Sequence, residues 1–328
     1  TRALQADFLL LLTAAIWGFG FVAQRSGMEY TGPFTYNAIR FLLGSLFLLP
    51  LILWRGKKQG KNENGKKTLP YAFAAGSCLF IAVILQQIGI MFTTVGNAGF
   101  ITSLYVVLTP IFGIFLGKKT GVPTWVGTVF TLAGLYFLSA AGVGGINPGD
   151  AITIVSAAFW ACHVLIIDRF VQFIDPVKLS AGQFAWCSFY ALIGALFIEP
   201  HFKSWAALVF PACEVQPWRT LPALVSSLAE GSFTFGSFMQ GAVPILYGGL
   251  GSVGVAYTLQ VVAQKNAPPA HATIILCLES PFAAFGGIII LREKPGAFTF
   301  LGFGLMLCGM LISQWEIIIA GREKIVKT

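Results

Sequence analysis

Runs of apolar residues close to 20 long recur along the chain, separated by short segments rich in Gly, Pro and charge. A helix of about that length spans the roughly 30 Å of hydrocarbon in a bilayer, and lipid exposure excludes open strands. Only 10% of the residues are charged, against about 25% in soluble domains. The sequence predicts an all-α membrane protein with ten transmembrane helices, at residues 7–24, 33–54, 69–92, 97–117, 122–140, 150–167, 178–198, 242–263, 270–291 and 298–319.

Positive charge is distributed unevenly between the two sides of this topology. With the N-terminus in the cytoplasm, 15 of the 21 Lys and Arg residues fall in cytoplasmic segments and five fall outside. Cytoplasmic loops carry such an excess, so both termini are expected in the cytoplasm. The basic run at 55–67 is expected to be a solvated loop that contacts anionic lipid. The net charge of +8 thus reflects topology, and no basic face indicates a nucleic-acid partner.

Sequence motifs for metals, disulfides and nucleotides are absent. Five of the six cysteines lie inside apolar spans, and none belongs to a C-x-x-C pair, so neither a metal site nor a disulfide framework is indicated. No GxxxxGK(S/T) loop is present, which argues against a built-in ATP motor. We therefore expect no cofactor.

The chain repeats itself at nearly constant spacing. Trp17 matches Trp160, Pro33 matches Pro176 and Arg40 matches Gln183 at an offset of 143 residues, and Thr109-Pro110 matches Ser280-Pro281 at 171. Such matches indicate a duplication into residues 1–143 and 144–328. Five spans per half is an odd number, so the second half must enter the bilayer inverted. Inverted repeats place a binding site near the midplane and support alternating access, which is the main reason to expect transport.

Several segments resemble the EamA branch of the drug/metabolite transporter (DMT) superfamily across almost the whole chain. They are AAIWGFGFVAQR (14–25), GPFTYNAIRFLLGSL (32–46), GNAGFITSLYVVLTPIF (96–112), VAYTLQVVAQKNAPPAHATIILCLESPFAAF (255–285) and LGFGLMLCGMLIS (301–313). The resemblance implies ten helices in two inverted five-helix repeats around a central cavity, and export of amino acids or other metabolites across a bacterial inner membrane.

The chain departs from this family at two places. Residues 199–241 are a long connection, expected to be an extracytoplasmic insertion with a short interfacial helix. The polar residue that the family often has after the first Trp-Gly is replaced by Gly20, whereas His163 occupies the equivalent place in the second half.

Arg40 and Glu279 are the fully charged residues that lie well away from the ends of the predicted spans. A charge at mid-span costs about 2.5–3.5 kcal/mol on insertion scales, so each should face a cavity or a partner. The planar fork of Arg40 suits a substrate carboxylate. The alternative is a permanent Arg40–Glu279 pair, or hydrogen bonds to helix carbonyls, that holds the helices together.

Further side chains could complete a substrate site. His163 can change charge near neutral pH, which would allow proton coupling; alternatively it is a neutral histidine hydrogen-bonded within the bundle. For His271 a role at the beginning of a helix is favoured. The other substrate-binding candidates are aromatic or amide residues, which also hydrogen-bond helices together in membranes: Trp17, Gln86, Tyr105, Trp160, Gln183 and Tyr257.

Pro110 and Pro281 lie at matched positions of the fourth and ninth spans. Each frees a backbone carbonyl and can kink its helix. The kink is either a hinge for opening and closing or a static feature of packing.

The sequence favours a secondary transporter, not an enzyme, that exports a small organic metabolite, with an amino acid or related amphipathic solute as the best guess. The alternatives are a passive channel and a membrane-embedded enzyme that acts on a lipid or prenyl substrate. An enzyme would need paired carboxylates, a metal cluster or a Ser/His/Asp set. Substrate identity, coupling ion and oligomeric state are left open.

Overall fold

The computed structural model describes residues 2–28, 30–59, 65–92, 95–140, 148–202, 204, 235–290 and 297–326. Within these ranges every regular element is a helix. The helices are α1 Arg2–Gly27, α2 Pro33–Gln59, α3 Gly65–Phe92, α4 Val95–Thr102, α5 Tyr105–Phe115, α6 Val122–Ala140, α7 Pro148–Phe170, α8 Pro176–Phe197, α11 Phe235–Leu246, the π-helix η1 Tyr247–Tyr257, α12 Thr258–Gln264, α13 Pro269–Leu276, α14 Glu279–Ile290 and α15 Ala297–Val326.

Seven segments are long and apolar enough to cross a membrane, which confirms a multi-pass helical membrane protein. They are Arg2–Gly27, Pro33–Trp54, Thr68–Phe92, Ala98–Phe115, Pro148–Phe170, Pro176–Phe197 and Gly241–Gln264. The other three predicted spans fall on α6, α13–α14 and α15, so the count of ten stays a prediction. Most of the predicted insertion at 199–241 lies outside the described residues, as does the centre of the basic loop at 55–67.

Two of the predicted spans are interrupted helices. The fourth breaks at Ser103-Leu104, between α4 and α5, and the ninth breaks at Cys277-Leu278, between α13 and α14. Pro281 explains the second break, because it has no N–H to donate to the carbonyl of Cys277 four residues earlier. The interruptions meet inside the bundle, where the Ser103 and Ser280 hydroxyl oxygens lie 2.7 Å apart.

The predicted eighth span, 242–263, agrees with the candidate span Gly241–Gln264, although helix α11 begins earlier, at Phe235. This span contains a π-helix that sequence periodicity did not indicate. The π-helix packs closely on α2 because each of the two helices places a glycine against the other. A Cβ on Gly44 would lie 2.3 Å from Val253, and one on Gly249 would lie 2.8 Å from Leu43. Small residues permit such close approach of helices in a membrane.

Paired hydroxyl-to-carbonyl contacts join α2 and α8. Ser45 Oγ donates to the carbonyl of Ala181 at 3.0 Å, and Ser188 Oγ donates to the carbonyl of Ala38 at 2.8 Å. These two bonds hold the helices together along their length.

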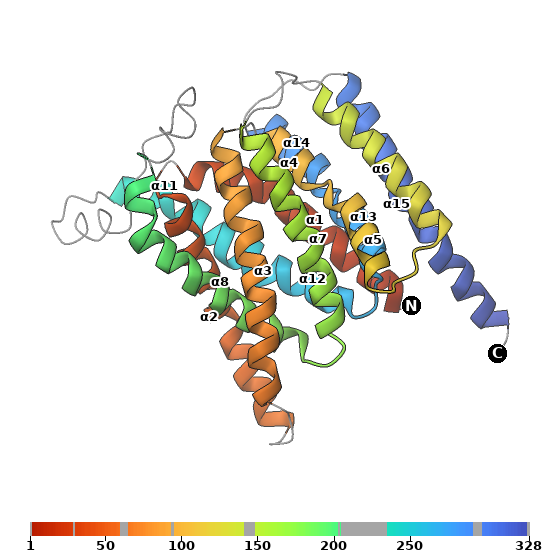
Figure 1. The fold of residues 1–328 in the computed structure, drawn as a ribbon, viewed down its shortest axis with the longest axis horizontal. Helices are drawn as coiled ribbons and strands as arrows, with labels where there is room; N and C mark the ends of the chain where they lie inside the picture. Colours follow the sequence, from red (N-terminus) through yellow and green to blue (C-terminus); the bar gives the residue numbers. More distant parts are fainter. Residues whose placement is uncertain are drawn as a thin grey trace.

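Helices α6 and α15 form a close pair at one side of the bundle, seen at the upper right of Figure 1. A Cβ on Gly127 would lie 2.6 Å from the carbonyl oxygen of Gly309, and one on Gly134 would lie 2.6 Å from that of Gly302. The chain ends marked N and C both lie toward the lower right of the same view. We call this end of the bundle the terminus side.

Candidate functional site: a pocket at the helix interruptions

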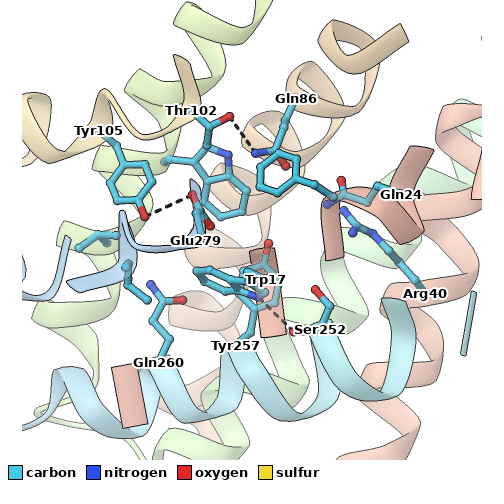
Figure 2. A pocket seen from close by; sticks show the side chains of 14 residues that line it. Trp17, Gln24, Arg40, Gln86, Thr102, Tyr105, Ser252, Tyr257, Gln260 and Glu279 are labelled. Atoms are coloured by element: carbon cyan, nitrogen blue, oxygen red, sulfur yellow. Dashed lines mark hydrogen bonds between the residues drawn. The ribbon is translucent and has the colours of Figure 1, made fainter. Parts of the chain in front are cut away.

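A buried pocket lies beside the interruptions of the fourth and ninth spans (Figure 2). Seven of the predicted spans, including both interrupted ones, contribute to its wall. The lining residues are Trp17, Phe21, Gln24, Arg40, Gln86, Thr102, Tyr105, Trp160, Val164, Ser252, Tyr257, Gln260, Leu276 and Glu279. Its free volume is about 30 Å³, comparable to the space of one water molecule in the liquid. In this conformation the site is closed around its polar groups.

Most of the predicted substrate-binding residues line this pocket. They are Trp17, Arg40, Gln86, Tyr105, Trp160, Tyr257 and Glu279. His163 and Gln183 do not; they are fully buried and bond each other, with His163 Nε2 and Gln183 Oε1 2.9 Å apart. His163 therefore sits behind the pocket wall, where its ring contacts that of Trp160 at 5.9 Å between centroids.

Arg40 is 2% exposed although it is a charged residue of α2, two turns after the helix begins. Its Nε donates to Asn37 Oδ1 at 2.8 Å, and its guanidinium carbon lies 5.3 Å from the ring centre of Tyr36 and 5.0 Å from that of Phe41. Cation–π contacts of this kind stabilise a desolvated guanidinium. Figure 2 shows the guanidinium directed toward the side chain of Gln24, on the pocket side.

Glu279 is the first residue of α14, directly after the helix interruption. A carboxylate is favourable there because the helix dipole is positive at its N-terminus. Tyr105, the first residue of α5, donates from its hydroxyl to Glu279 Oε1 at 3.5 Å. Arg40 and Glu279 share the pocket, but within the described residues no ion pair joins them. The permanent Arg40–Glu279 pair considered from the sequence is therefore not present in this conformation.

Three aromatic rings form one wall of the pocket. The ring centres of Trp17 and Tyr257 are 4.5 Å apart, and Trp160 stacks on Tyr257 at 5.9 Å with planes inclined by 19°. Trp17 Nε1 donates to the carbonyl of Ser252 at 3.3 Å, which fixes its ring against η1. The wall is predominantly aromatic, as is usual in small-molecule sites.

Several buried polar atoms of the lining have no hydrogen-bond partner among the described residues. They are Gln24 Oε1, Gln260 Oε1 and Trp160 Nε1. By contrast, Gln86 Nε2 donates to Thr102 Oγ1 at 3.0 Å. Unpaired buried polar groups are costly, and in native proteins they call for an explanation such as a ligand. Two acceptors and one donor that belong to lining residues of the pocket are therefore available to a ligand.

Sequence reasoning missed some of the lining, although part of it carried a signal. Phe21 and Gln24 follow Trp17 by four and seven residues, so helical spacing places all three on one face of α1. Ser252 and Tyr257 are five residues apart, a separation that would point them about 140° apart in an α-helix. The π-helix has i→i+5 hydrogen bonds and brings both residues to the pocket.

The two prolines predicted as hinges lie differently with respect to the pocket. Pro281 is in the first turn of α14, next to the interruption and two residues after Glu279. Pro110 lies inside α5, after the interruption at Ser103-Leu104, and borders a second cavity. Neither proline side chain lines the central pocket.

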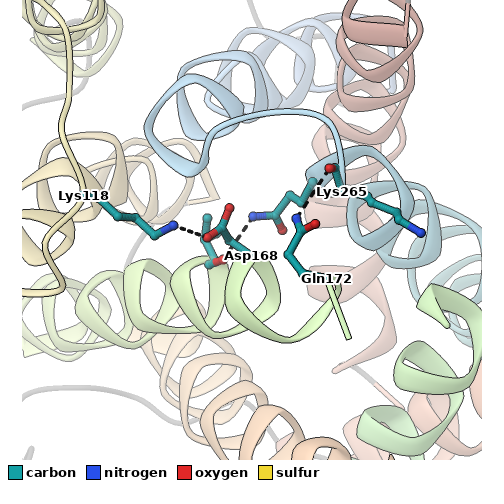
Figure 3. Close-up of polar contacts among 6 residues, drawn as sticks. Lys118, Asp168, Gln172 and Lys265 are labelled. Atoms are coloured by element: carbon teal, nitrogen blue, oxygen red, sulfur yellow. Dashed lines mark hydrogen bonds and ion pairs between the residues drawn. The ribbon is translucent and has the colours of Figure 1, made fainter. Parts of the chain in front are cut away.

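Polar cross-links close the terminus side of the bundle (Figure 3). Lys118 forms an ion pair with Asp168 at the end of α7, and Gln172 Nε2 donates to the carbonyl of Lys265 at 3.5 Å. Gln264 Nε2 donates to the carbonyl of Val164 at 3.0 Å. In the described part of the chain, no three His, Cys, Asp or Glu side chains gather into a metal-binding group.

Known proteins are similar to this chain in sequence or in fold. An uncharacterized transporter from Archaeoglobus fulgidus is 28% identical over 95% of this chain and 86% of its own length, and a second from that organism is 24% identical over 94% and 97%. The uncharacterized inner membrane transporter YedA of Escherichia coli is 28% identical over 51% of this chain and 53% of its own. One crystal structure matches in fold with a TM-score of 0.67, at 18% identity, covering 93% of this chain and 96% of the other.

A family model matches almost the entire chain in two segments, residues 4–140 and 147–315. Together with the apolar helices, this match confirms the resemblance of the sequence motifs and the general role in transport. The chain belongs to the EamA-like transporter family.

Proposed function

We propose that the chain is a secondary transporter that exports a small organic metabolite, an amino acid or a related amphipathic solute, by alternating access. The observation that carries the proposal is that one buried pocket is lined by Arg40, by Glu279 and by three residues with unpaired polar atoms. An Arg fork suits a carboxylate, a carboxyl group suits an ammonium, and the aromatic wall suits an apolar body. A zwitterion with an apolar side chain matches this set.

The proposal includes two inverted five-helix halves, residues 1–143 and 144–328, with ten transmembrane helices. Reciprocal contacts support it. Ser45 and Ser188 are related by the offset of 143 residues, and so are Ala38 and Ala181; each serine bonds the alanine of the other half. A two-fold axis between α2 and α8 would produce this exchange.

Glycines at the other side of the bundle exchange in the same way. By the sequence repeat Gly127 corresponds to Gly302 and Gly134 to Gly309, whereas in space Gly127 faces Gly309 and Gly134 faces Gly302. The two segments matched by the family model also fall one in each half. The excess of Lys and Arg in the predicted cytoplasmic segments supports placing both termini in the cytoplasm. The E. coli relative is named an inner membrane transporter, which supports an inner membrane for this chain.

The closed pocket favours a carrier over a passive channel. Ligand pockets usually measure about 300–1,000 Å³, whereas this pocket has about 30 Å³. A metabolite can enter only if helices move apart, and the interrupted helices beside Pro110 and Pro281 are the places where we expect them to bend.

Counterflow in proteoliposomes tests the function. The purified protein is reconstituted with an unlabelled amino-acid mixture inside, and uptake of the radiolabelled mixture is measured. Saturable uptake that needs the internal mixture supports a carrier, and non-saturable flux supports a channel. Loss of a charge-assisted hydrogen bond costs about 1.5–3 kcal/mol, so Arg40→Ala should lower counterflow about 10- to 100-fold.

Two further variants sharpen the test. Arg40→Lys keeps the charge but loses the planar fork, and should recover counterflow only in part. Arg169→Ala removes an exposed cation at the end of α7 and should leave counterflow unchanged. Full counterflow by a folded Arg40→Ala protein would remove Arg40 from the substrate site.

A further inference from the structure

A second polar cluster lies far from the central pocket, near the other end of α1. His271 Nε2 is 2.9 Å from Asp7 Oδ1, and His271 Nδ1 is 3.2 Å from Ser313 Oγ. The three side chains come from α13, α1 and α15 and are buried. The His271 and Asp7 side chains are only 3% and 9% exposed. Neither Asp7 nor His271 lines the central pocket, so substrate binding there does not account for this buried carboxyl–imidazole contact.

The Ser313 hydroxyl oxygen lies within hydrogen-bond distance of two groups, the Met310 carbonyl at 2.8 Å and His271 Nδ1 at 3.2 Å. With its hydrogen on the carbonyl, Ser313 accepts from Nδ1 while an ionised Asp7 accepts from Nε2, so both ring nitrogens donate and the ring is an imidazolium. With its hydrogen on Nδ1, the ring is neutral and donates only to Asp7. The same contacts therefore accommodate the cluster with or without one extra proton.

Water can reach this cluster from the terminus side. His271 and Ser313 line a cavity of about 360 Å³, with room for on the order of ten water molecules. Lys119, an exposed residue, lines the same cavity. The other charged groups that face this cavity are Lys118 and Asp168, which pair with each other. In contrast, His163 lines neither this cavity nor the central pocket; it bonds Gln183 and its ring packs against that of Trp160.

The cluster joins two helices that carry the central pocket. Helix α1 continues from Asp7 to Trp17, Phe21 and Gln24, and α13 leads from His271 through the interruption to Glu279. His271 and Glu279 are eight residues apart in the sequence, on the two sides of this interruption. A change in the Asp7–His271 contact therefore changes how two walls of the pocket are held together at the terminus side.

We propose that Asp7 and His271 form the proton-binding site through which transport is coupled to the proton gradient. While the protein is open to the opposite side, a hydronium ion gives its proton to the lone pair of neutral His271, leaving water, and the Ser313 hydroxyl hydrogen turns to the Met310 carbonyl. The proton later leaves to a water molecule in the terminus-side cavity. No other bond forms or breaks. The Asp7–His271 hydrogen bond becomes an ion pair that holds α1 and α13 together, and loss of the proton lets the terminus side open.

A Ser–His–Asp set also occurs in hydrolases, but its geometry here does not suit hydrolysis. The Ser313 hydroxyl is turned to a carbonyl of its own helix, and the neighbouring amides lie within α15, where helix hydrogen bonds occupy them. An oxyanion hole needs free donors next to the nucleophile. Proton storage needs only the contacts that are present.

The first test does not depend on transport. The protein has three histidines, so ¹⁵N-histidine labelling in nanodiscs gives few signals, and His271→Gln identifies the His271 signal. We expect His271 to be an imidazolium at pH 6. In Asp7→Asn, protonation of His271 should require at least a tenfold higher proton concentration. His201→Gln, at an exposed position after α8, is the matched control and should leave that signal in place. A neutral His271 at pH 6, or an identical titration in Asp7→Asn, overturns the proposal.

The second test rests on the proposed transport function. The amino-acid mixture is added to proteoliposomes that contain a pH-sensitive dye, and the dye reports proton movement. Uptake driven by a pH gradient is measured in the same proteoliposomes and compared with counterflow. The ratio of gradient-driven uptake to counterflow should fall at least tenfold in His271→Gln and stay unchanged in His201→Gln. An unchanged ratio in His271→Gln overturns coupling at this site. Absence of counterflow in the wild type would instead refute the proposed function, while the nuclear magnetic resonance test would still decide the proton site. If the wild-type protein hydrolyses esters and Ser313→Ala abolishes this activity, the cluster is a hydrolase site and the proposal is overturned.

Discussion

Gly18 lies where α1 and α14 approach most tightly, and its substitution gives a sharp test of the pocket's construction. A Cβ at this position would lie 2.3 Å from Phe282 Cβ, 2.7 Å from the carbonyl oxygen of Glu279 and 2.8 Å from the amide nitrogen of Ala283. Carbon atoms in contact normally lie about 3.5–4.0 Å apart. Two of the three neighbours are backbone atoms, and no side-chain rotation can relieve their overlap with the added Cβ. Helix α14 must therefore move away from α1 by roughly 1 Å.

Gly20 provides the matched control on the same helix. A Cβ there meets nothing nearer than Ser252 Oγ at 3.7 Å, an ordinary contact. Both Gly→Ala changes gain about 1 kcal/mol of helix propensity, so this gain cancels when the two variants are compared. Overpacking costs about 1–3 kcal/mol, and Gly18→Ala should therefore be less stable than Gly20→Ala by about that amount.

Thermal unfolding in detergent measures the difference. One kcal/mol shifts the melting temperature by about 2–4 °C in domains of 150–250 residues, so the two variants should differ by several degrees. Counterflow should also slow in Gly18→Ala, because the displaced helix carries Glu279, and stay at the wild-type level in Gly20→Ala. Equal melting temperatures for the two variants would refute the close approach of α1 and α14.

Two further variants separate binding from stability. Trp160→Phe removes the unpaired Nε1 donor but keeps the ring stack. It should lower counterflow about tenfold, which corresponds to about 1.4 kcal/mol, without lowering the melting temperature. A lower melting temperature with full transport would contradict a substrate role for Trp160. Glu199 is fully buried and accepts from the amides of Phe34 and Thr35 at 2.8 and 2.9 Å. Glu199→Ala removes this cap and should destabilise the protein by about 1–2 kcal/mol, and an unchanged melting temperature would show that the cap is not needed.

The sequence could predict the helices because each apolar run must match the thickness of the bilayer. Arg40 and Glu279 could be singled out because a charge at mid-span needs a polar surrounding. Helical spacing from Trp17 would also have found Phe21 and Gln24. These inferences depend on local periodicity, composition and cost of burial, all of which can be read along the chain.

Other features depend on contacts between distant segments. Asp7 and His271 are 264 residues apart, and no local pattern pairs them. The π-helix at 247–257 is rich in glycine, so apolar periodicity is too weak there to reveal its altered winding. The interruption at Ser103-Leu104 precedes Pro110 by several residues, and the proline alone therefore did not locate it. Tertiary packing decides each of these.

The central claim is that the pocket between Arg40 and Glu279 is exposed alternately to both sides of the membrane. Ser252 lines this pocket and is 3% exposed, so Ser252→Cys, with the six native cysteines replaced, reports on access. A membrane-impermeant maleimide should label this cysteine in both right-side-out and inside-out vesicles, and the transported amino acid should slow labelling from either side. Labelling from one side only, or from neither, would contradict alternating access at this pocket.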